Sequence, residues 1–531
     1  MSFREFNHHA QTVGELLDRG RAHDALRSVR AAREELKNLP SPDLLRLAKL
    51  ACLLVDTGTD LRSEEIIHEG LTIFAERYEE LASVIHHANL EYNIGNAKKS
   101  LYDIVSIGSP TRFRPESIAL LTEAKGHYWK AIKHAEGATP EPQLLVNLAN
   151  ALDQCGRVVE ALMWFDRALE IDPAFGMAHL NRGQALLFLN QLSDTYTVSL
   201  LSDTKKAFRL AETSGQLPDH LMKTAREYRE QLNQQLLEIG WDNDRISAYD
   251  EQHRAEYEEH DDYWRFCLSN YLALCEHALY CHCAGARRDD ISIPKQSGPI
   301  GGDFIPKLEV LLNRIKSEFC LARSLYYQAV RSEQLWDTRP FEGTFTELYE
   351  GEAIGIRPEF LRTSFRLCFG ILDRIAQGLN ELYSLAKPSE ELYFESFWRP
   401  RDQQKQGKEE RWDLINQQDN MGLVALYSLA TDLNRVGGEW GFFKESRNAL
   451  EHGLLVVLSD DRTELPSIAV PEWISFETVS IEEFRRRALH MLQFTVSAIF
   501  SFVFCVRTEG LRQRQRPATT VTLSKKDIGK E

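Results

Sequence analysis

The chain of 531 residues is too long for one ordinary hydrophobic core, so we expect two or three domains. Its 43% hydrophobic and 27% charged residues are typical of globular proteins, and its net charge of -16 excludes a general coat protein for nucleic acid, which needs a broad basic surface. The chain starts without the apolar segment of a secretory signal, and its nine cysteines suggest no disulfide framework, so we expect reduced thiols and a cytoplasmic location.

The clearest internal repeat unit spans residues 142–173, where apolar residues at helical spacing flank a central glycine turn. This unit resembles a tetratricopeptide repeat (TPR), in which small residues such as Ala149 let two helices cross closely. Gly95 and Gly183 stand at the position of Ala149 in the neighbouring units. We therefore expect residues 1–215 to form a TPR-like helical solenoid with a concave groove.

Three asparagines, Asn93, Asn147 and Asn181, occupy one position in successive units, two residues before the small packing residue. In some TPR superhelices an asparagine ladder at this position binds the backbone of an extended peptide. A carboxamide both donates and accepts hydrogen bonds, so it can pair with a peptide unit of any sequence. The ladder predicts a peptide or protein partner in the groove. The alternative is that each amide caps a local backbone group or is solvated.

Residues 216–300 are expected to form a helical connector that ends in a glycine-rich linker. This segment contains Cys275, His277, Cys281 and Cys283, which are residue types that bind zinc. The pattern indicates a continuous helix, which would spread these side chains around its axis, and buried thiols behave as small hydrophobic groups. We therefore predict no metal site and no cofactor.

Residues 301–510 contain several amphipathic stretches typical of a helical bundle. One helix is expected over residues 441–458, with a polar cluster of Arg447, Asn448 and His452. Asn448 and His452 are four residues apart and would share one helix face, and the long Arg447 side chain can swing to the same side. A guanidinium, an amide and an imidazole would then converge on one patch suited to a phosphodiester.

The most apolar run, residues 491–506, is interrupted by polar side chains and is too short for a comfortable bilayer span. We therefore predict a buried core helix here and no membrane partner. Residues 511–531 are basic and poor in apolar side chains, so we expect a flexible tail.

The segment ESRNALEH within an all-helical bundle resembles the HEPN superfamily, the higher eukaryote and prokaryote nucleotide-binding domains. The signature of that superfamily is an arginine, a polar residue and then a histidine after four to six intervening residues. The segments FRLCFGILDRIAQGLNELYSL, FESFWRP and NMGLVALYSLATDL resemble its LA2681-like branch, which commonly follows a helical-repeat region. Three other arginine–histidine pairs have similar spacing: Arg4/His9, Arg254/His260 and Arg485/His490. Unlike the arginines of these three pairs, Arg447 has both a polar neighbour, Asn448, and an apolar stripe on its helix.

The resemblance implies an all-α protein, with a TPR-like solenoid followed by a HEPN bundle, and a metal-independent endoribonuclease. His452 would accept the proton of a ribose 2′-hydroxyl, Arg447 would stabilise the phosphorane, and Asn448 would orient His452 or a phosphate oxygen. The products would carry a 2′,3′-cyclic phosphate. The resemblance also implies a homodimer through the HEPN domain, and a role as a bacterial toxin or anti-phage effector.

Glu451 has a supporting role in this hypothesis, because it stands four residues after Arg447 and could hold it in an ion pair until RNA binds. The alternative for this helix is a surface Arg447–Glu451 pair beside a packed histidine. The alternative for the whole protein is a non-catalytic adaptor that binds protein or RNA.

Overall fold

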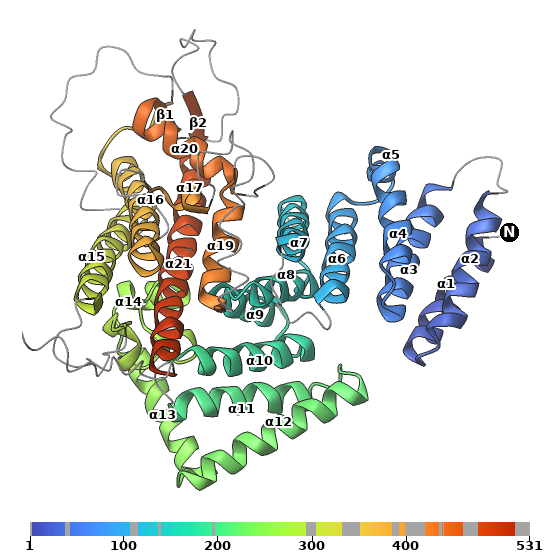
Figure 1. The fold of residues 1–531 in the computed structure, drawn as a ribbon, viewed down its shortest axis with the longest axis horizontal. Coiled ribbons are helices and arrows are strands. Elements are labelled where there is room, and N and C mark those ends of the chain that lie inside the picture. The colour runs from blue at the N-terminus through green and yellow to red at the C-terminus, as the bar shows by residue number, and fades with distance from the viewer. Residues whose placement is uncertain are drawn as a thin grey trace, which may run out of the picture.

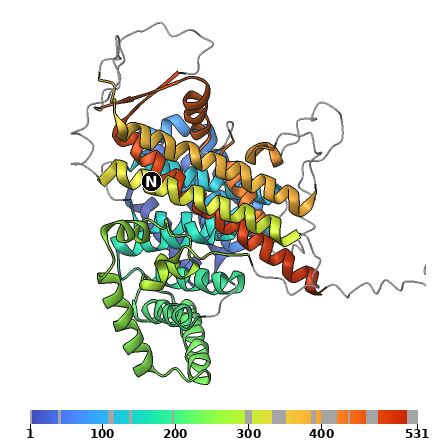
Figure 2. The ribbon, with the colours of Figure 1, turned by 90° about the vertical axis from the view of Figure 1, so that its left-hand side faces the viewer.

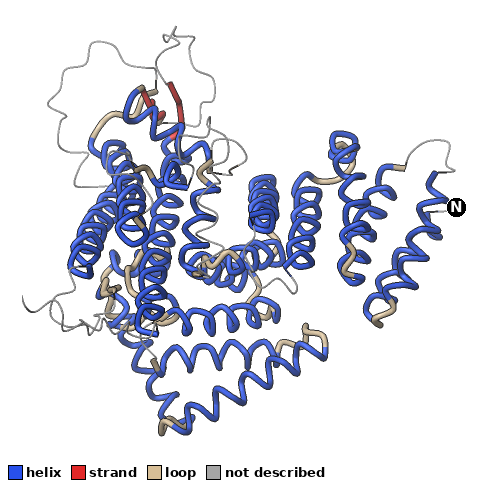
Figure 3. Tube along the Cα trace, in the orientation of Figure 1, coloured by secondary structure: helices blue, strands red, loops and turns tan. Residues whose placement is uncertain are grey.

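The computed structural model describes residues 3–37, 43–106, 115–135, 140–193, 197–293, 304–331, 351–384, 392–398, 420–434, 438, 440–459 and 476–515. Helices make up nearly all the regular structure of this part of the chain, so the expected all-α fold is confirmed (Figures 1 and 3). A curved array of helices leads from the N-terminus to a C-terminal bundle, and the bundle packs against the middle of the array (Figure 1).

Helix pairs build the array, and the two members of each pair pack against one another. The pairs are α1 (Phe3–Asp18) with α2 (Ala22–Lys37), α3 (Leu44–Leu61) with α4 (Glu64–Glu76), α6 (His87–Ser106) with α7 (Pro115–His134), α8 (Pro142–Gln154) with α9 (Val158–Ile171), and α10 (Gly176–Leu192) with α11 (Val198–Thr213). The short helix α5 (Tyr78–Ala82) follows the second pair. Small residues let these helices approach, because a Cβ atom on Gly95 would lie 2.7 Å from the Tyr128 ring.

The connector contains α12 (Asp219–Glu238), α13 (Asn243–Glu258) and α14 (Asp262–Ser269), and then two short 3-10 turns, η1 (Glu276–Leu279) and η2 (Ala284–Arg288). The continuous helix expected across Cys275 to Cys283 is therefore wrong. The chain leaves the helix where Tyr271 adopts a positive φ of 58°. Beyond that point, side chains hold the backbone, because Asp289 accepts hydrogen bonds from the Leu274 amide at 2.6 Å and from Arg323 at 2.7 Å.

The bundle consists of α15 (Phe304–Arg331), α16 (Ile356–Tyr383), α17 (Phe394–Trp398), α19 (Met421–Asp432), α20 (Gly441–His452) and α21 (Ile481–Gln515). Figure 2 shows α15, α16 and α21 lying side by side. By length and composition α21 could cross a membrane, but 89% of its most apolar stretch is buried inside the protein, which confirms the predicted core helix. It continues five residues beyond the expected start of the tail at 511, and residues 516–531 lie outside the described part.

The helix expected over residues 441–458 is too long, because α20 ends at His452. Gly453 is not helical (φ -140°, ψ -139°), and the apolar run that follows forms strand β1 (Leu454–Leu458). This strand pairs in parallel with β2 (Phe476–Ser480), with Leu454 opposite Phe476. A short buried run rich in leucine and valine suits a strand as well as a helix face, and here the pairing with β2 decides between them.

The array and the bundle share one hydrophobic core, a cluster of buried side chains that includes members from Tyr102 in α6 to Val506 in α21. A buried ionic network crosses the same contact. Asp432, at the end of α19, pairs with Lys125 of α7 at 2.9 Å and with Arg157, whose side chain also contacts Glu160 at 2.7 Å. The start of α20 is therefore held close to the middle of the array.

Candidate active site

One face of α20 fixes this helix in the bundle. Phe443, Ala449 and Leu450 are buried on it, and the buried Ser446 hydroxyl accepts a hydrogen bond from Arg487 of α21 at 3.1 Å. Arg487 also pairs with Glu477 of β2 at 2.5 Å, so α21 ties the helix to the small sheet. The opposite face then presents the polar residues of the predicted cluster.

A cavity of about 410 Å³ lies between α20 and its neighbours. Its walls come from α16, the segment around α17, the end of α19 and α20 itself. The lining residues are Phe369, Leu372, Asp373, Tyr393, Phe394, Glu395, Leu433, Lys444, Arg447 and Asn448. The volume lies within the range of small-molecule sites, and the lining combines apolar rings with a few polar groups, as such sites do.

Arg447 is the centre of this cavity's electrostatics. Its guanidinium lies 5.5 Å from the centroid of the Phe369 ring and 5.9 Å from that of Tyr393. Burial raises the pKa of Asp373 on the facing wall, and the charges of Arg447 and Arg374 oppose this shift. Within the described residues Arg447 makes no ion pair, so its charge is available to an anion that enters the cavity.

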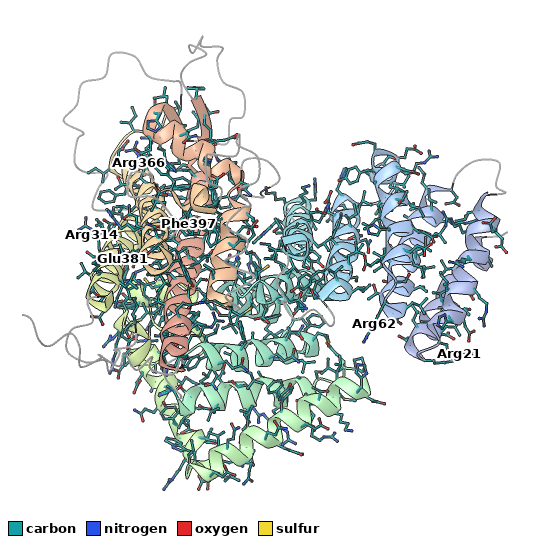
Figure 4. The ribbon with its side chains drawn as sticks, viewed as in Figure 1. Arg21, Arg62, Arg314, Arg366, Glu381 and Phe397 are labelled. Atoms are coloured by element: carbon teal, nitrogen blue, oxygen red, sulfur yellow. The ribbon has the colours of Figure 1, made fainter. Side chains whose placement is uncertain are left out.

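The expected ion pair between Arg447 and Glu451 is not formed. Glu451 instead pairs with Arg366 of α16 at 3.4 Å, and Arg366 also donates to the backbone carbonyl of Leu450. Figure 4 labels Arg366 near the end of α16 that approaches α20. Sequence reasoning missed Arg366 because nothing in the local pattern of α16 indicates its position beside the cluster. It adds another arginine to those that contact α20.

His452 is the last residue of α20 and is exposed, whereas Arg447 and Asn448 are partly buried. His452 is not among the residues that line the cavity, whereas Arg447 and Asn448 are. At 3.6 residues per turn, five residues separate Arg447 from His452 by about 140° around the helix axis, whereas Asn448 and His452 are only about 40° apart. The imidazole of His452 is exposed and lies outside the lining of the cavity.

The other histidines with arginines at similar spacing are packed into the protein. The His490 ring lies 3.9 Å from the Trp440 ring, and burial lowers its pKa to about 3. The buried His260 makes a hydrogen bond through Nε2 to the carbonyl of His282 at 3.0 Å. The side chains of the pair Arg4/His9 lie outside the described residues. His490 and His260 are therefore packed into the protein and have structural roles.

The three asparagines of the array have different hydrogen-bond partners. Asn147 lines a cavity of about 820 Å³ on the inner side of the array, and its amide donates to Asn96 at 2.9 Å. Asn181 donates to Asn150, which lines the same cavity. Asn93 donates to the carbonyl of Asn89 in its own helix at 2.8 Å, which is the local alternative. Sequence reasoning missed Asn96 and Asn150, which stand three residues further along their helices.

Residues 301–509 match the family model described as LA2681-like HEPN. This part of the chain is a LA2681-like HEPN domain. The match includes Arg447, Asn448 and His452, and its extent is close to that of the bundle. HEPN domains are generally ribonucleases, which suggests an RNA-directed or nucleotide-directed role. The match does not include the array, and no curated protein matches the chain.

Proposed function

We propose that the protein is a regulated, metal-independent endoribonuclease whose HEPN domain cuts RNA and whose TPR-like array senses a partner. The observation that supports the proposal most is the Arg447 cavity. Within a HEPN domain it offers a guanidinium, the Asn448 amide and two aromatic rings, next to an exposed imidazole at His452. These groups are a cation for a phosphate, a hydrogen-bonding group, and a base.

The proposed reaction is an internal attack. His452 takes the proton of the ribose 2′-hydroxyl, the 2′-oxygen forms a bond to phosphorus, and the bond from phosphorus to the 5′-oxygen breaks. Arg447 stabilises the charge on the phosphorane, and the departing 5′-oxygen takes up the proton that the imidazole accepted. The products are a 2′,3′-cyclic phosphate and a 5′-hydroxyl, and DNA is not cut because it lacks the attacking hydroxyl.

A dimer follows naturally from the position of His452. Because this exposed imidazole does not line the cavity of its own chain, a second α20 packed against the first would bring the His452 of one copy to the Arg447 of the other. The proposed active form is therefore a homodimer through the HEPN domain, with composite sites.

The inner cavity of the array supports the sensing role. Asp56, Asp60 and Asp103 line it together with the amides of Asn147 and Asn150. Amides pair with a peptide backbone and carboxylates pair with basic side chains, so the proposed partner is an extended, positively charged peptide segment. A bacterial toxin or anti-phage effector in the cytoplasm is the role that we propose for such a controlled nuclease.

The decisive experiment compares purified wild-type protein with the His452→Ala and Arg447→Ala variants on end-labelled RNA, with EDTA present only during the assay. We expect cleavage by the wild type to leave 2′,3′-cyclic phosphate ends. Removal of the base should slow cutting by about 10²–10⁴-fold, and removal of the guanidinium by about 10²–10³-fold. His68→Ala, which changes an exposed histidine on α4, is the matched control and should cut at the wild-type rate.

The proposal fails if His452→Ala cuts RNA as fast as the wild type. The second candidate, a non-catalytic adaptor, has one observation in its favour, since His452 does not line the cavity that holds Arg447. It predicts RNA binding without cleavage by wild type and variants alike, and no toxicity on overproduction.

A further inference from the structure

Four potential metal ligands meet in the connector, which precedes the HEPN domain in the chain. His253 comes from α13, His277 from η1, and Cys281 and Cys283 from the turn that follows. One ligand atom of each residue lies within 4.8 Å of those of the other three. Two of the contacts are already short, because Cys281 Sγ lies 3.1 Å from His253 Nδ1 and Cys283 Sγ lies 3.1 Å from His277 Nε2.

We propose that these four side chains bind one Zn²⁺ ion at a structural site. Two thiolates and two imidazoles are the ligand set of tetrahedral structural zinc. Bonds of about 2.3 Å to sulfur and 2.0–2.1 Å to nitrogen place the ligand atoms of a tetrahedron about 3.3–3.8 Å apart. The observed spacing of 3.1 Å to at most 4.8 Å brackets these values. Two separate thiol–imidazole hydrogen bonds explain two short contacts but not the gathering of all four atoms.

The surroundings of His277 orient it for this role. Its Nδ1 atom lies 3.2 Å from the Tyr280 hydroxyl and 3.4 Å from the Ser199 hydroxyl, so Nε2 faces the cluster. The Tyr280 hydroxyl is held in turn by Thr197 at 2.8 Å. Zinc-binding histidines usually have such a partner on the second ring nitrogen, because it fixes the tautomer and the direction of the ring.

The cluster is accessible from solvent, and a metal ion there would stabilise the connector. A cavity of about 390 Å³ reaches His253 and Cys281, which are both only partly buried. The chain between α14 and α15 has little regular structure, with only η1 and η2 among its described residues. A metal that joins this chain to α13 would hold it in place, as the hydrogen bond from the Ala284 amide to Glu256 of α13 already does at 3.0 Å.

Cys275 provides the matched control, since it lies in the same segment but outside the cluster. Its Sγ donates to the carbonyl of Gly285 at 3.7 Å, and its side chain is buried. Full-length protein, freed of any affinity tag and purified with a reductant from zinc-supplemented cells, should contain one zinc ion per chain by elemental mass spectrometry. The zinc content should fall at least about tenfold in Cys283→Ser and in His253→Ala, and should stay unchanged in Cys275→Ser.

Two further measurements on the wild type test the proposal even if a ligand variant does not fold. Titration of the wild type with a mercurial should release the zinc, and cobalt(II) exchanged into the wild type should give the intense visible absorption of tetrahedral coordination. Cys281→His preserves four ligands and should retain the metal with a shifted cobalt spectrum. Wild type without zinc, equal zinc loss in Cys275→Ser, another metal in place of zinc, or a Cys281–Cys283 disulfide in the reduced preparation would each overturn the proposal.

Discussion

The contact between the array and the HEPN domain can be tested at one carboxylate, Asp432. Its side chain is 2% exposed, and it accepts hydrogen bonds from Lys125 at 2.9 Å and from Arg157. Burial alone would raise the pKa of Asp432, but these two cations and the hydrogen bonds that they donate lower it below its usual value, so the group is ionised. With Glu160 included, the network holds two positive and two negative charges.

The substitution Asp432→Asn keeps the shape of the side chain and removes one negative charge. Arg157 keeps its two contacts with Glu160 at 2.7 Å, whereas Lys125 keeps only uncharged acceptors, the Ser428 hydroxyl at 2.7 Å and the amide oxygen of the new side chain. An uncompensated buried charge costs about 3–5 kcal/mol, so we expect the free energy of unfolding to fall by that amount. The free energy of unfolding can be measured by denaturant titration with tryptophan fluorescence as the signal, because the rings of Trp129 and Trp440 lie 4.8 Å apart at the same contact.

Two further variants test the electrostatic explanation. The double variant Lys125→Met, Asp432→Asn restores neutrality and should recover at least half of the lost stability. Glu80→Gln breaks the exposed pair with Arg77, whose side chains are 46% and 47% exposed, and should cost no more than about 1 kcal/mol. If Asp432→Asn costs less than about 1 kcal/mol, or if the double variant is no more stable than the single one, the network does not hold the two parts together as described.

Two further predictions concern packing and pH. Gly422→Ala should lower the melting midpoint, with a cost of about 1–3 kcal/mol, because its Cβ would lie 2.4 Å from the backbone nitrogen of Cys505; Gly126→Ala meets nothing within 4 Å and should be neutral or slightly stabilising. Burial lowers the pKa of His490 to about 3, whereas the ordinary pKa of a histidine is about 6.5. As the pH falls below about 6.5, the unfolded chain therefore binds a proton that the folded chain does not bind. Stability should hold above about pH 6.5 and fall below it by up to about 1.4 kcal/mol per pH unit, and denaturant midpoints at pH 7 and pH 5 should show less of this fall in His490→Phe. An unchanged pH slope in that variant would contradict the assignment.

The local part of the candidate site could be predicted from the sequence, and the non-local part could not. Arg447, Asn448 and His452 belong to one short helix, so their order along the chain was enough to select them. The end of that helix was predicted wrongly because residues 454–458 pair with a strand about twenty residues away in sequence. Asp373 and Arg366 stand on another helix, and only packing brings Asp373 to the cavity and Arg366 to Glu451.

The cysteine-rich segment shows the same limit more clearly. Its residue types are those that bind zinc, but its helical pattern argued against a metal site. The four residues selected from the sequence also included Cys275, whereas the fourth member of the cluster in the structure is His253. His253 lies on α13, and nothing near it in sequence links it to Cys281. The turn at Tyr271 that brings them together depends on Asp289 and on Arg323 of α15, so the site is a product of tertiary structure.

The shared core has a consequence for how such a protein can be divided or can evolve. A cut at residue 301 follows the family boundary but splits one body of packed side chains, in which Trp129 of the array contacts Trp440 of the HEPN domain. Neither half would keep the whole hydrophobic core, so an isolated HEPN fragment would expose apolar side chains that are buried in the full chain and would associate nonspecifically. The array is therefore no interchangeable cassette. A recombination event that supplied a new array would also have to supply the part of the interior that the HEPN domain lacks.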